Sequence, residues 1–209
     1  MCWSFEVSII IGTISYSVAT YLWIRNYEND RWHSAILFTV STIQFLEAII
    51  WHMNKNGADT TNITKIVIMF LIPLVLSLEP IASLFGAQYS GKKISDYDKI
   101  FFVIIFVIMF MTLTTNNSYP NIFVNNTIRY RKNDNFGWHY WIFFILLMYP
   151  LIKYSENNIF YIILYVIVGM ALIFSLNKKS PGSTWCLYGN IIAILLLFYP
   201  YLNKKFINY

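Results

Sequence analysis

Charged side chains are scarce in this chain. Only 12% of its 209 residues are Asp, Glu, Lys or Arg, whereas 57% are hydrophobic, and the mean hydropathy is +0.53. A soluble globular domain carries about 25% charged residues, so this chain has too little polar surface to cover a water-soluble protein. The composition therefore excludes a soluble domain and predicts an integral membrane protein that contacts the lipid bilayer.

Cysteine, histidine and lysine are too rare, or wrongly placed, for several classes of membrane protein. The two cysteines, Cys2 and Cys186, cannot form a disulfide framework, and whether they pair with each other stays open. None of the three histidines lies in the last apolar segment, which argues against seven-helix zinc hydrolases of the ceramidase or adiponectin-receptor type. That segment also has no lysine between Thr184 and Asn203, so we expect no retinal Schiff base.

Motifs for common cofactors and for nucleic acids are missing as well. The chain contains no phosphate loop, nucleophile elbow or dinucleotide fingerprint, so no cofactor is predicted. The net charge of +5 comes from Lys and Arg in short loops beside apolar segments, where basic residues anchor helix ends. Because aromatic residues do not interleave with these charges, as single-strand binding would require, we expect no nucleic-acid partner.

Apolar segments long enough to cross a membrane recur along the chain. A hydrocarbon core of about 30 Å needs about 20 apolar residues in a helix, and seven segments approach that length. The connections between them are too short to hold a separate domain. The sequence therefore predicts an all-α, single-domain bundle of seven transmembrane helices over residues 1–209, with approximate bounds 5–24, 34–53, 66–88, 99–115, 137–154, 158–176 and 184–202.

The distribution of sequons favours one orientation of this bundle. Three Asn-x-Ser/Thr sequons begin at Asn62, Asn116 and Asn125, all in loops on the side of the N-terminus, although their use stays open. Lys and Arg divide almost equally between the two sides, so they add little. The first residues lack the basic region of a cleaved signal peptide. We expect a multi-pass protein with its N-terminus outside or lumenal and its C-terminus cytoplasmic.

Three polar or aromatic residues near the end of the second segment are the first candidates for a functional site. Gln44, Glu47 and Trp51 are spaced i, i+3 and i+7, so they share one face of a helix. A carboxylate this deep in the membrane costs roughly 2.5–3.5 kcal/mol on insertion scales, and it usually faces a bundle interior, a partner or water. We therefore expect Glu47 to bind a ligand or an ion, or to form an obligatory structural contact.

A second carboxylate precedes a proline in the third segment. Pro80 cannot donate a backbone hydrogen bond to the carbonyl of Leu76, and Pro73 interrupts the same helix earlier. Freed carbonyls beside the Glu79 carboxylate are typical of ion or polar-substrate sites in broken helices. In the alternative interpretation, Glu79 pairs with a donor such as Gln44 or Asn190 and only fixes the packing.

Antiparallel threading predicts a mouth for this site at the level of the N-terminus. The residues expected there are Cys2, Trp3 and Glu6 from the start of the chain, and Ser183, Trp185 and Cys186 from the start of the seventh segment. Asn190 lies deeper in that segment and is expected to turn inward. With His52 and His139 these residues could bind a metal or relay protons. Alternatively, they form an aromatic belt at the membrane interface, with wet histidines.

Three short motifs resemble a known group of proteins. They are Met1-Cys2-Trp3-Ser4, the Gln-x-x-Glu of Gln44 and Glu47, and the Ser-x-Trp-Cys that begins at Ser183. Together they are similar to a family of small seven-helix membrane proteins of unknown function from giant viruses and some algae or protists. The resemblance implies no activity. It does imply that the N-terminus, Glu47 and the Ser-x-Trp-Cys turn belong to one site.

The sequence leaves three classes of function open. The leading hypothesis is a small channel, transporter or ligand-binding bundle for an ion or a small molecule, in which Glu47 suits proton coupling. The second is a structural protein of a viral or organelle membrane, in which buried polar groups only fix the helix register. The third and least favoured is a metal-dependent membrane enzyme. A homo-oligomer is compatible with all three.

Overall fold

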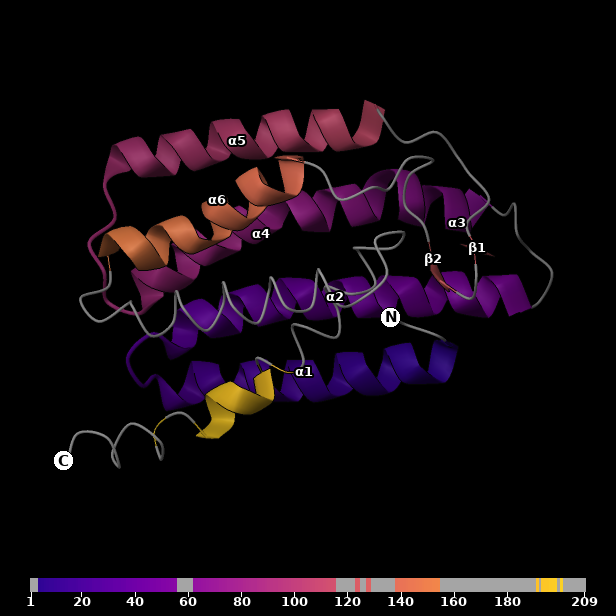
Figure 1. Cartoon of the computed structure of the whole chain (residues 1–209), viewed down its shortest axis with the longest axis horizontal. Helices are drawn as coiled ribbons and strands as arrows, with labels where there is room; N and C mark the ends of the chain where they lie inside the picture. The colour runs from indigo at the N-terminus through magenta and orange to yellow at the C-terminus, as the bar shows by residue number, and fades with distance from the viewer. Residues whose placement is uncertain are drawn as a thin grey trace.

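The computed structural model describes residues 4–55, 62–115, 123–124, 127–128, 138–154, 191, 193–198 and 200. These residues are helical except for the cap residue Ser4, the connections at 26–29 and 90–95, and two short antiparallel strands, β1 (Phe123–Val124) and β2 (Thr127–Ile128). The helices are α1 (Phe5–Arg25), α2 (Asp30–Lys55), α3 (Asn62–Ile66), α4 (Ile72–Tyr89), α5 (Asp96–Thr115) and α6 (Trp138–Tyr154), as Figure 1 shows. A π-helical turn, Val67–Leu71, joins α3 to α4.

Four helices in the described part of the chain are long and apolar enough to cross a membrane. They are Phe5–Arg25, Asp30–Met53, Asn62–Tyr89 and Asp96–Thr115, and each overlaps one of the first four predicted segments. A shorter apolar helix, Ile142–Tyr154, falls within the fifth. The sixth segment lies outside the described residues, and the seventh overlaps them only over residues 191–200. The all-α membrane architecture is confirmed, whereas the number seven stays a prediction.

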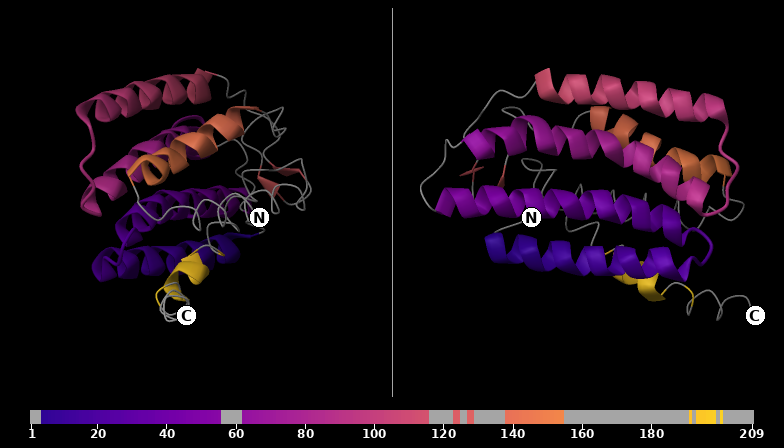
Figure 2. Two further views of the ribbon diagram at one scale, coloured as in Figure 1. Left: turned by 60° about the vertical axis from the view of Figure 1, so that its left-hand side comes forward. Right: turned by 180° about the vertical axis from the view of Figure 1, so that it is seen from behind.

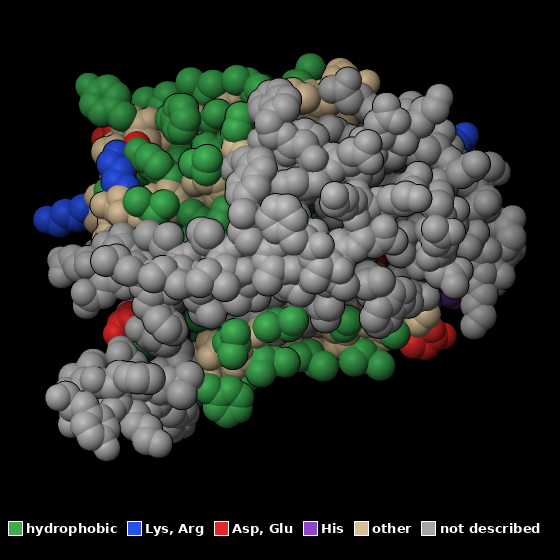
Figure 3. Space-filling view, viewed as in Figure 1, with side chains coloured by type: hydrophobic (Ala, Val, Ile, Leu, Met, Phe, Trp, Pro, Cys, Tyr) green, Lys and Arg blue, Asp and Glu red, His purple; other side chains and the backbone are tan. Residues whose placement is uncertain are grey.

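The helices form layers, with α2 and α4 in the interior. Figures 1 and 2 show α1, α2, α4 and α5 in successive layers, with α6 beside α4. The outer layer α5 exposes a continuous apolar side, which Figure 3 shows as hydrophobic side chains along the top of the molecule. Its exposed residues are Ile100, Phe101, Val103, Ile104, Val107, Ile108 and Met111. This side suits contact with lipid, because hydrocarbon solvates apolar side chains without cost.

Small residues bring α1 close to α2. Ser8, Gly12, Ser15 and Ala19 recur every three or four residues along the buried side of α1. The hydroxyl of Ser34 on α2 donates to the carbonyl of Ala19 over 2.6 Å, so the two backbones approach closely. Such stripes of small residues are how membrane helices gain van der Waals contact in the absence of a hydrophobic driving force.

A glycine permits a still closer contact between α2 and α4. A Cβ atom added to Gly86 would lie 2.7 Å from both the carbonyl oxygen of Arg31 and the Cα of Trp32. Both of these are backbone atoms, so they cannot move aside without displacing α2. The contact places Gly86 directly opposite Trp32 and sets the register of the two antiparallel helices.

Proline explains where α4 begins within the third spanning helix, and glycine explains where it ends. Because Pro73 has no N–H, the hydrogen-bond ladder is interrupted there, and the N–H of Ile72 bonds to the carbonyl of Val67 in a π turn. At the other end, the N–H of Lys92 bonds to the carbonyl of Ala87. This closure requires a left-handed residue, and Gly91 supplies it with φ +86°.

The two helix contacts predict different responses to an added methyl group. We expect Gly86→Ala to lower the melting temperature of the purified protein by several degrees, since overpacking costs about 1–3 kcal/mol and backbone lines the site. Gly12→Ala is the comparison and should lower the melting temperature less, because a methyl group there would lie 3.1–3.2 Å from the ring of Phe45 and the Cβ of Gln44, contacts that a shift of a few tenths of an ångström relieves. Equal melting temperatures of the two variants in detergent would contradict the proposed register.

Candidate functional site

Gln44 and Glu47 lie on one buried face of α2. His33, Leu37 and Val40 precede them at intervals of three or four residues, which is the spacing of residues on one side of a helix. Gln44 and Glu47 are each 0% exposed, and the other three are also buried. The prediction that this face turns into the bundle is therefore confirmed for the two polar residues.

The first helix runs directly beside Gln44. A methyl group added to Gly12 would lie 3.2 Å from the Cβ of Gln44. Ser8 and Ser15, one turn away on either side of Gly12, are also buried. Hydroxyl groups and a glycine thus line the α1 side of the contact, where larger apolar side chains would separate the helices. The α1 side of Gln44 is consequently polar as well as closely packed.

Glu79 is a second fully buried carboxylate, and it lies on the side of α4 that faces α2. It is seven residues from both Ile72 and Gly86, so the three share one side of the helix. Because Gly86 contacts Trp32, the antiparallel register places Glu79 level with Thr39.

The register also separates the two carboxylates in depth. Thr39 precedes Glu47 by eight residues, which is about 12 Å along a helix axis. Glu79 and Glu47 therefore occupy different depths of the membrane, with Gln44 between them. The difference in depth between the Glu47 and Glu79 backbone positions is the feature of the polar centre that a functional interpretation has to explain.

A chain of hydrogen bonds through Ser83, one helical turn from Glu79, connects α2, α4 and α6. The indole N–H of Trp32 donates to the hydroxyl oxygen of Ser83 over 2.8 Å. That hydroxyl in turn donates to the carbonyl of Leu147 on α6 over 2.6 Å. Trp32 is 1% exposed, so this contact lies in the bundle core. It holds α2, α4 and α6 in one register without using either carboxylate.

The remaining predicted site residues are only partly described. Glu6 is exposed in the first turn of α1, and its grouping with Gln44 and Glu47 stays a prediction. Trp51 is half-buried and packs against an apolar cluster that includes Ile50 and Ile68. The rings of Phe5 and His52 are 5.4 Å apart, so the start of α1 and the end of α2 do share one level.

The other half of the predicted mouth lies outside the described residues. This applies to Cys2, Trp3, Ser183, Trp185, Cys186 and Asn190, and the structure does not describe the side chain of His139. Within the described ranges, no three His, Cys, Asp or Glu side chains come together in a group that could hold a metal ion. Their predicted convergence with Glu47 stays a prediction.

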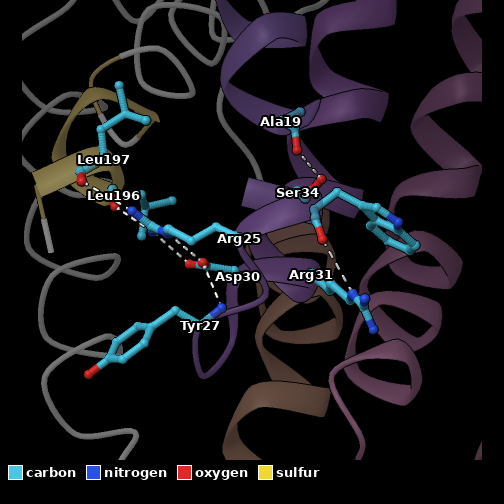
Figure 4. Close-up of polar contacts among 9 residues, drawn as sticks. Ala19, Arg25, Tyr27, Asp30, Arg31, Ser34, Leu196 and Leu197 are labelled. Carbon is cyan, nitrogen blue, oxygen red and sulfur yellow. Dashed lines mark hydrogen bonds and ion pairs between the residues drawn. The ribbon is translucent and has the colours of Figure 1, made fainter. Parts of the chain in front are cut away.

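Sequence reasoning missed an ion pair at one end of the bundle. Arg25, at the end of α1, binds both carboxylate oxygens of Asp30 over 2.6 and 2.8 Å. The same guanidinium donates to the carbonyls of Leu196 and Leu197 over 3.0 and 3.2 Å, as Figure 4 shows. Arg25 thus joins the α1–α2 turn to the helical residues near the C-terminus.

A second cluster at the same end joins α5 to α6. The carboxylate of Asp98 accepts hydrogen bonds from the ammonium group of Lys153 over 2.7 and 3.0 Å and from the hydroxyl of Tyr149 over 2.9 Å. The hydroxyl of Tyr154 also donates to it. Tyr149, Lys153 and Tyr154 lie on neighbouring positions of one helix face, a polar pattern in α6 that could have indicated a buried partner.

The chain matches no known protein family, and neither a curated protein nor a solved structure shows significant similarity to it. The class of the protein must therefore be inferred from its own residues. It is a helical membrane protein with buried carboxylates. Four membrane-length helices and the complete burial of Glu47 and Glu79 support this conclusion.

Two ion pairs on α5 allow a matched test of the Asp98 cluster. We expect Asp98→Asn to lower the melting temperature by several degrees, because the ammonium of Lys153 and two tyrosine hydroxyls lose a charged acceptor. Asp96→Asn removes the exposed pair with Lys99 and should change the melting temperature little, since surface ion pairs contribute little. Thermal unfolding of both variants in detergent makes the comparison, and equal effects would contradict the structural role of Asp98.

Proposed function

We propose that this protein is a small membrane channel, transporter or ligand-binding bundle with seven transmembrane helices. Its polar centre comprises Gln44, Glu47 and Glu79. The observation that carries the proposal is that all three side chains are 0% exposed although they lie inside membrane-length helices. Ionisable groups are rare at such positions, where they mark substrate and ion pathways.

Three further features support a pathway rather than a single polar contact. The carboxylates lie at two depths of the bundle, with Gln44 between them. Buried hydroxyls from Ser15, Ser41 and Ser77 are distributed through the same interior. The helix that carries Glu79 also contains a π turn at Val67–Leu71, and such irregular turns occur frequently at functional sites. Together these features suit stepwise passage of an ion or a small polar molecule.

The proposal extends to residues that the structure does not describe. We place Cys2, Trp3, Glu6, Ser183, Trp185 and Cys186 at the mouth of the pathway and Asn190 on its wall, with segments 158–176 and 184–202 as the sixth and seventh helices. The short motifs shared with small seven-helix proteins of giant viruses and protists support the same grouping, and membership of that family is part of this proposal.

Removal of one charge tests the proposal. We expect Glu47→Gln to abolish transport or ligand binding in proteoliposomes while expression and thermal stability are retained, because the amide keeps the shape and hydrogen bonding of the carboxyl. Glu28→Gln makes the same chemical change in the exposed α1–α2 turn and should behave like wild type. The measurement is flux or binding in a screen of ions, lipids and small organic molecules.

A structural membrane protein is the second candidate, and the Trp32–Ser83–Leu147 contact favours it. In that case the buried polar groups fix the helix register and nothing passes between them. Glu47→Gln would then lower the melting temperature, and wild-type protein would show no flux or binding in the screen. Full activity in a folded Glu47→Gln variant would exclude Glu47 from the pathway.

We also propose that the N-terminus is outside or lumenal. The three sequons at Asn62, Asn116 and Asn125, all in predicted connections on the side of the N-terminus, support this orientation. Lys and Arg over the whole sequence divide almost equally between the two sides, so they add little.

Cysteine labelling tests the orientation. In a background without Cys2 and Cys186, we expect Asn62→Cys to react with a membrane-impermeant maleimide in intact cells. Lys93→Cys, in the turn at the other end of α4, should react only after the membrane is permeabilised. The reverse pattern would show that the N-terminus is cytoplasmic.

A further inference from the structure

We propose that the ion carried by this protein is the proton and that His33 is a third ionisable group on its path, with Glu79 and Glu47. This inference rests on the proposed function and goes further by naming the ion and adding a residue. The observation behind it is that these three groups are buried at successive depths of the bundle, His33 and Glu47 on one face of α2 and Glu79 on α4.

His33 belongs to the same face of α2 as the polar centre. It precedes Gln44 by eleven residues and Glu47 by fourteen, which are multiples of the helical repeat to within a few tens of degrees. Its side chain is 1% exposed and its ring lies 4.8 Å from the indole of Trp32. The imidazole therefore lies inside the bundle, near the end at which Arg25 and Asp30 pair.

The separation of the groups along the bundle axis is regular. His33 precedes Thr39, the residue level with Glu79, by six positions, which is about 9 Å at 1.5 Å per residue. From that level to Gln44 is about 8 Å, and from Gln44 to Glu47 about 5 Å. The four groups together span about 21 Å, or two-thirds of a hydrocarbon core of about 30 Å.

The proposed path requires water between the three groups. The backbone levels of His33 and Glu79 are about 9 Å apart and those of Glu79 and Glu47 about 12 Å; the side chains fill part of each gap, and bridging waters form hydrogen bonds almost as good as direct ones. The hydroxyl of Ser41 donates to the carbonyl of Leu37, so its oxygen can accept a hydrogen bond within this region. A hydrogen-bonded chain of this kind conducts protons and excludes hydrated metal ions.

The spread of the groups also distinguishes a proton from a metal ion. A metal site requires several ligands at one point, and within the described ranges no three acidic, histidine or cysteine side chains form such a group. A proton needs only one basic atom at a time, and Asp, Glu and His at successive depths are typical of proton relays in pumps and transporters.

The proton balance closes without a further reactant. A proton that binds the carboxylate of Glu47 passes through bridging water to Glu79, then to His33, and leaves at the end of the bundle where Arg25 and Asp30 lie, while the amide of Gln44 only forms hydrogen bonds to that water. Each group returns to its starting protonation state, so the net change is one proton moved across the membrane. The charged groups that face His33 at that end are Arg25 and Asp30 on the α1–α2 turn.

Groups on the other elements complete the electrostatic surroundings. On α5 and α6, Asp98 and Lys153 are bonded to each other and to Tyr149, so their charges largely compensate. On α4, Glu79 is the carboxylate nearest to the path. The described helical residues 191, 193–198 and 200 contribute no acidic, basic or histidine side chain.

Proteoliposomes that enclose a pH-sensitive dye test the inference. A potassium gradient with valinomycin sets a membrane potential, and the change in internal pH reports proton flux. We expect wild-type protein to conduct protons, and His33→Gln, Glu79→Gln and Glu47→Gln each to lower the rate at least tenfold. Glu28→Gln is the matched control and should conduct like wild type.

Specific outcomes overturn the inference. A folded His33→Gln variant with wild-type proton flux would remove His33 from the path. If any variant fails to fold, wild-type protein alone carries the test, since its flux must persist when external sodium is replaced by N-methylglucamine. If wild type moves no protons yet Glu47→Gln still abolishes flux of another ion or binding of a ligand, the proton inference is wrong and the proposed function stands.

Discussion

Hydrocarbon offers no hydrogen-bond partner to a polar group, and this constraint governs the polar contacts of the whole bundle. Hydroxyls within the spanning helices bond to carbonyls one turn earlier, as Ser41 does to Leu37 and Thr112 to Ile108. A longer side chain can carry a buried N–H group that its own helix cannot pair. In that case another helix supplies the acceptor, as Ser83 does for the indole N–H of Trp32. The close approach of α2 to α1 at Gly12 and to α4 at Gly86 makes the hydrogen bonds between these helices possible. Small residues and hydroxyl groups therefore act together.

The same constraint explains why charged residues lie at the helix ends. The last carbonyls of a helix have no intrahelical donor and carry the negative end of the helix dipole. Arg31 donates to the final carbonyl of α4 at Tyr89, and Arg25 donates to Leu196 and Leu197. Each arginine therefore supplies hydrogen-bond donors to backbone carbonyls of another helix, and those carbonyls in turn stabilise its positive charge. A movement that separates the helices at this end would break several charge-assisted bonds at once.

Composition and periodicity were sufficient to predict the membrane class, the first four spanning segments and the burial of Gln44 and Glu47. They missed the ion pairs, because Asp98 and Lys153 are far apart in the chain and only the packing of α5 on α6 brings them together. The predicted start of the second helix at residue 34 was four residues late. Asp30 begins that helix because its carboxylate binds Arg25 and the N–H of Tyr27, a local contact that hydropathy does not report. The mouth around Cys2 and Cys186 stays a prediction, because it depends on residues outside the described ranges.

The contact of Trp32, Ser83 and Leu147 bears on why the carboxylates are there. Buried polar groups can be retained only to specify how helices align, but here neutral side chains already hold α2, α4 and α6 in register, and Gly86 sets the α2–α4 pairing by backbone contact. Two carboxylates at different depths each add the cost of removing a charge, or a carboxylic acid, from water. An alignment role would be satisfied by one polar layer, whereas a path across the membrane requires groups at several levels. The separation of Glu47 from Glu79 therefore favours a function over a purely structural role.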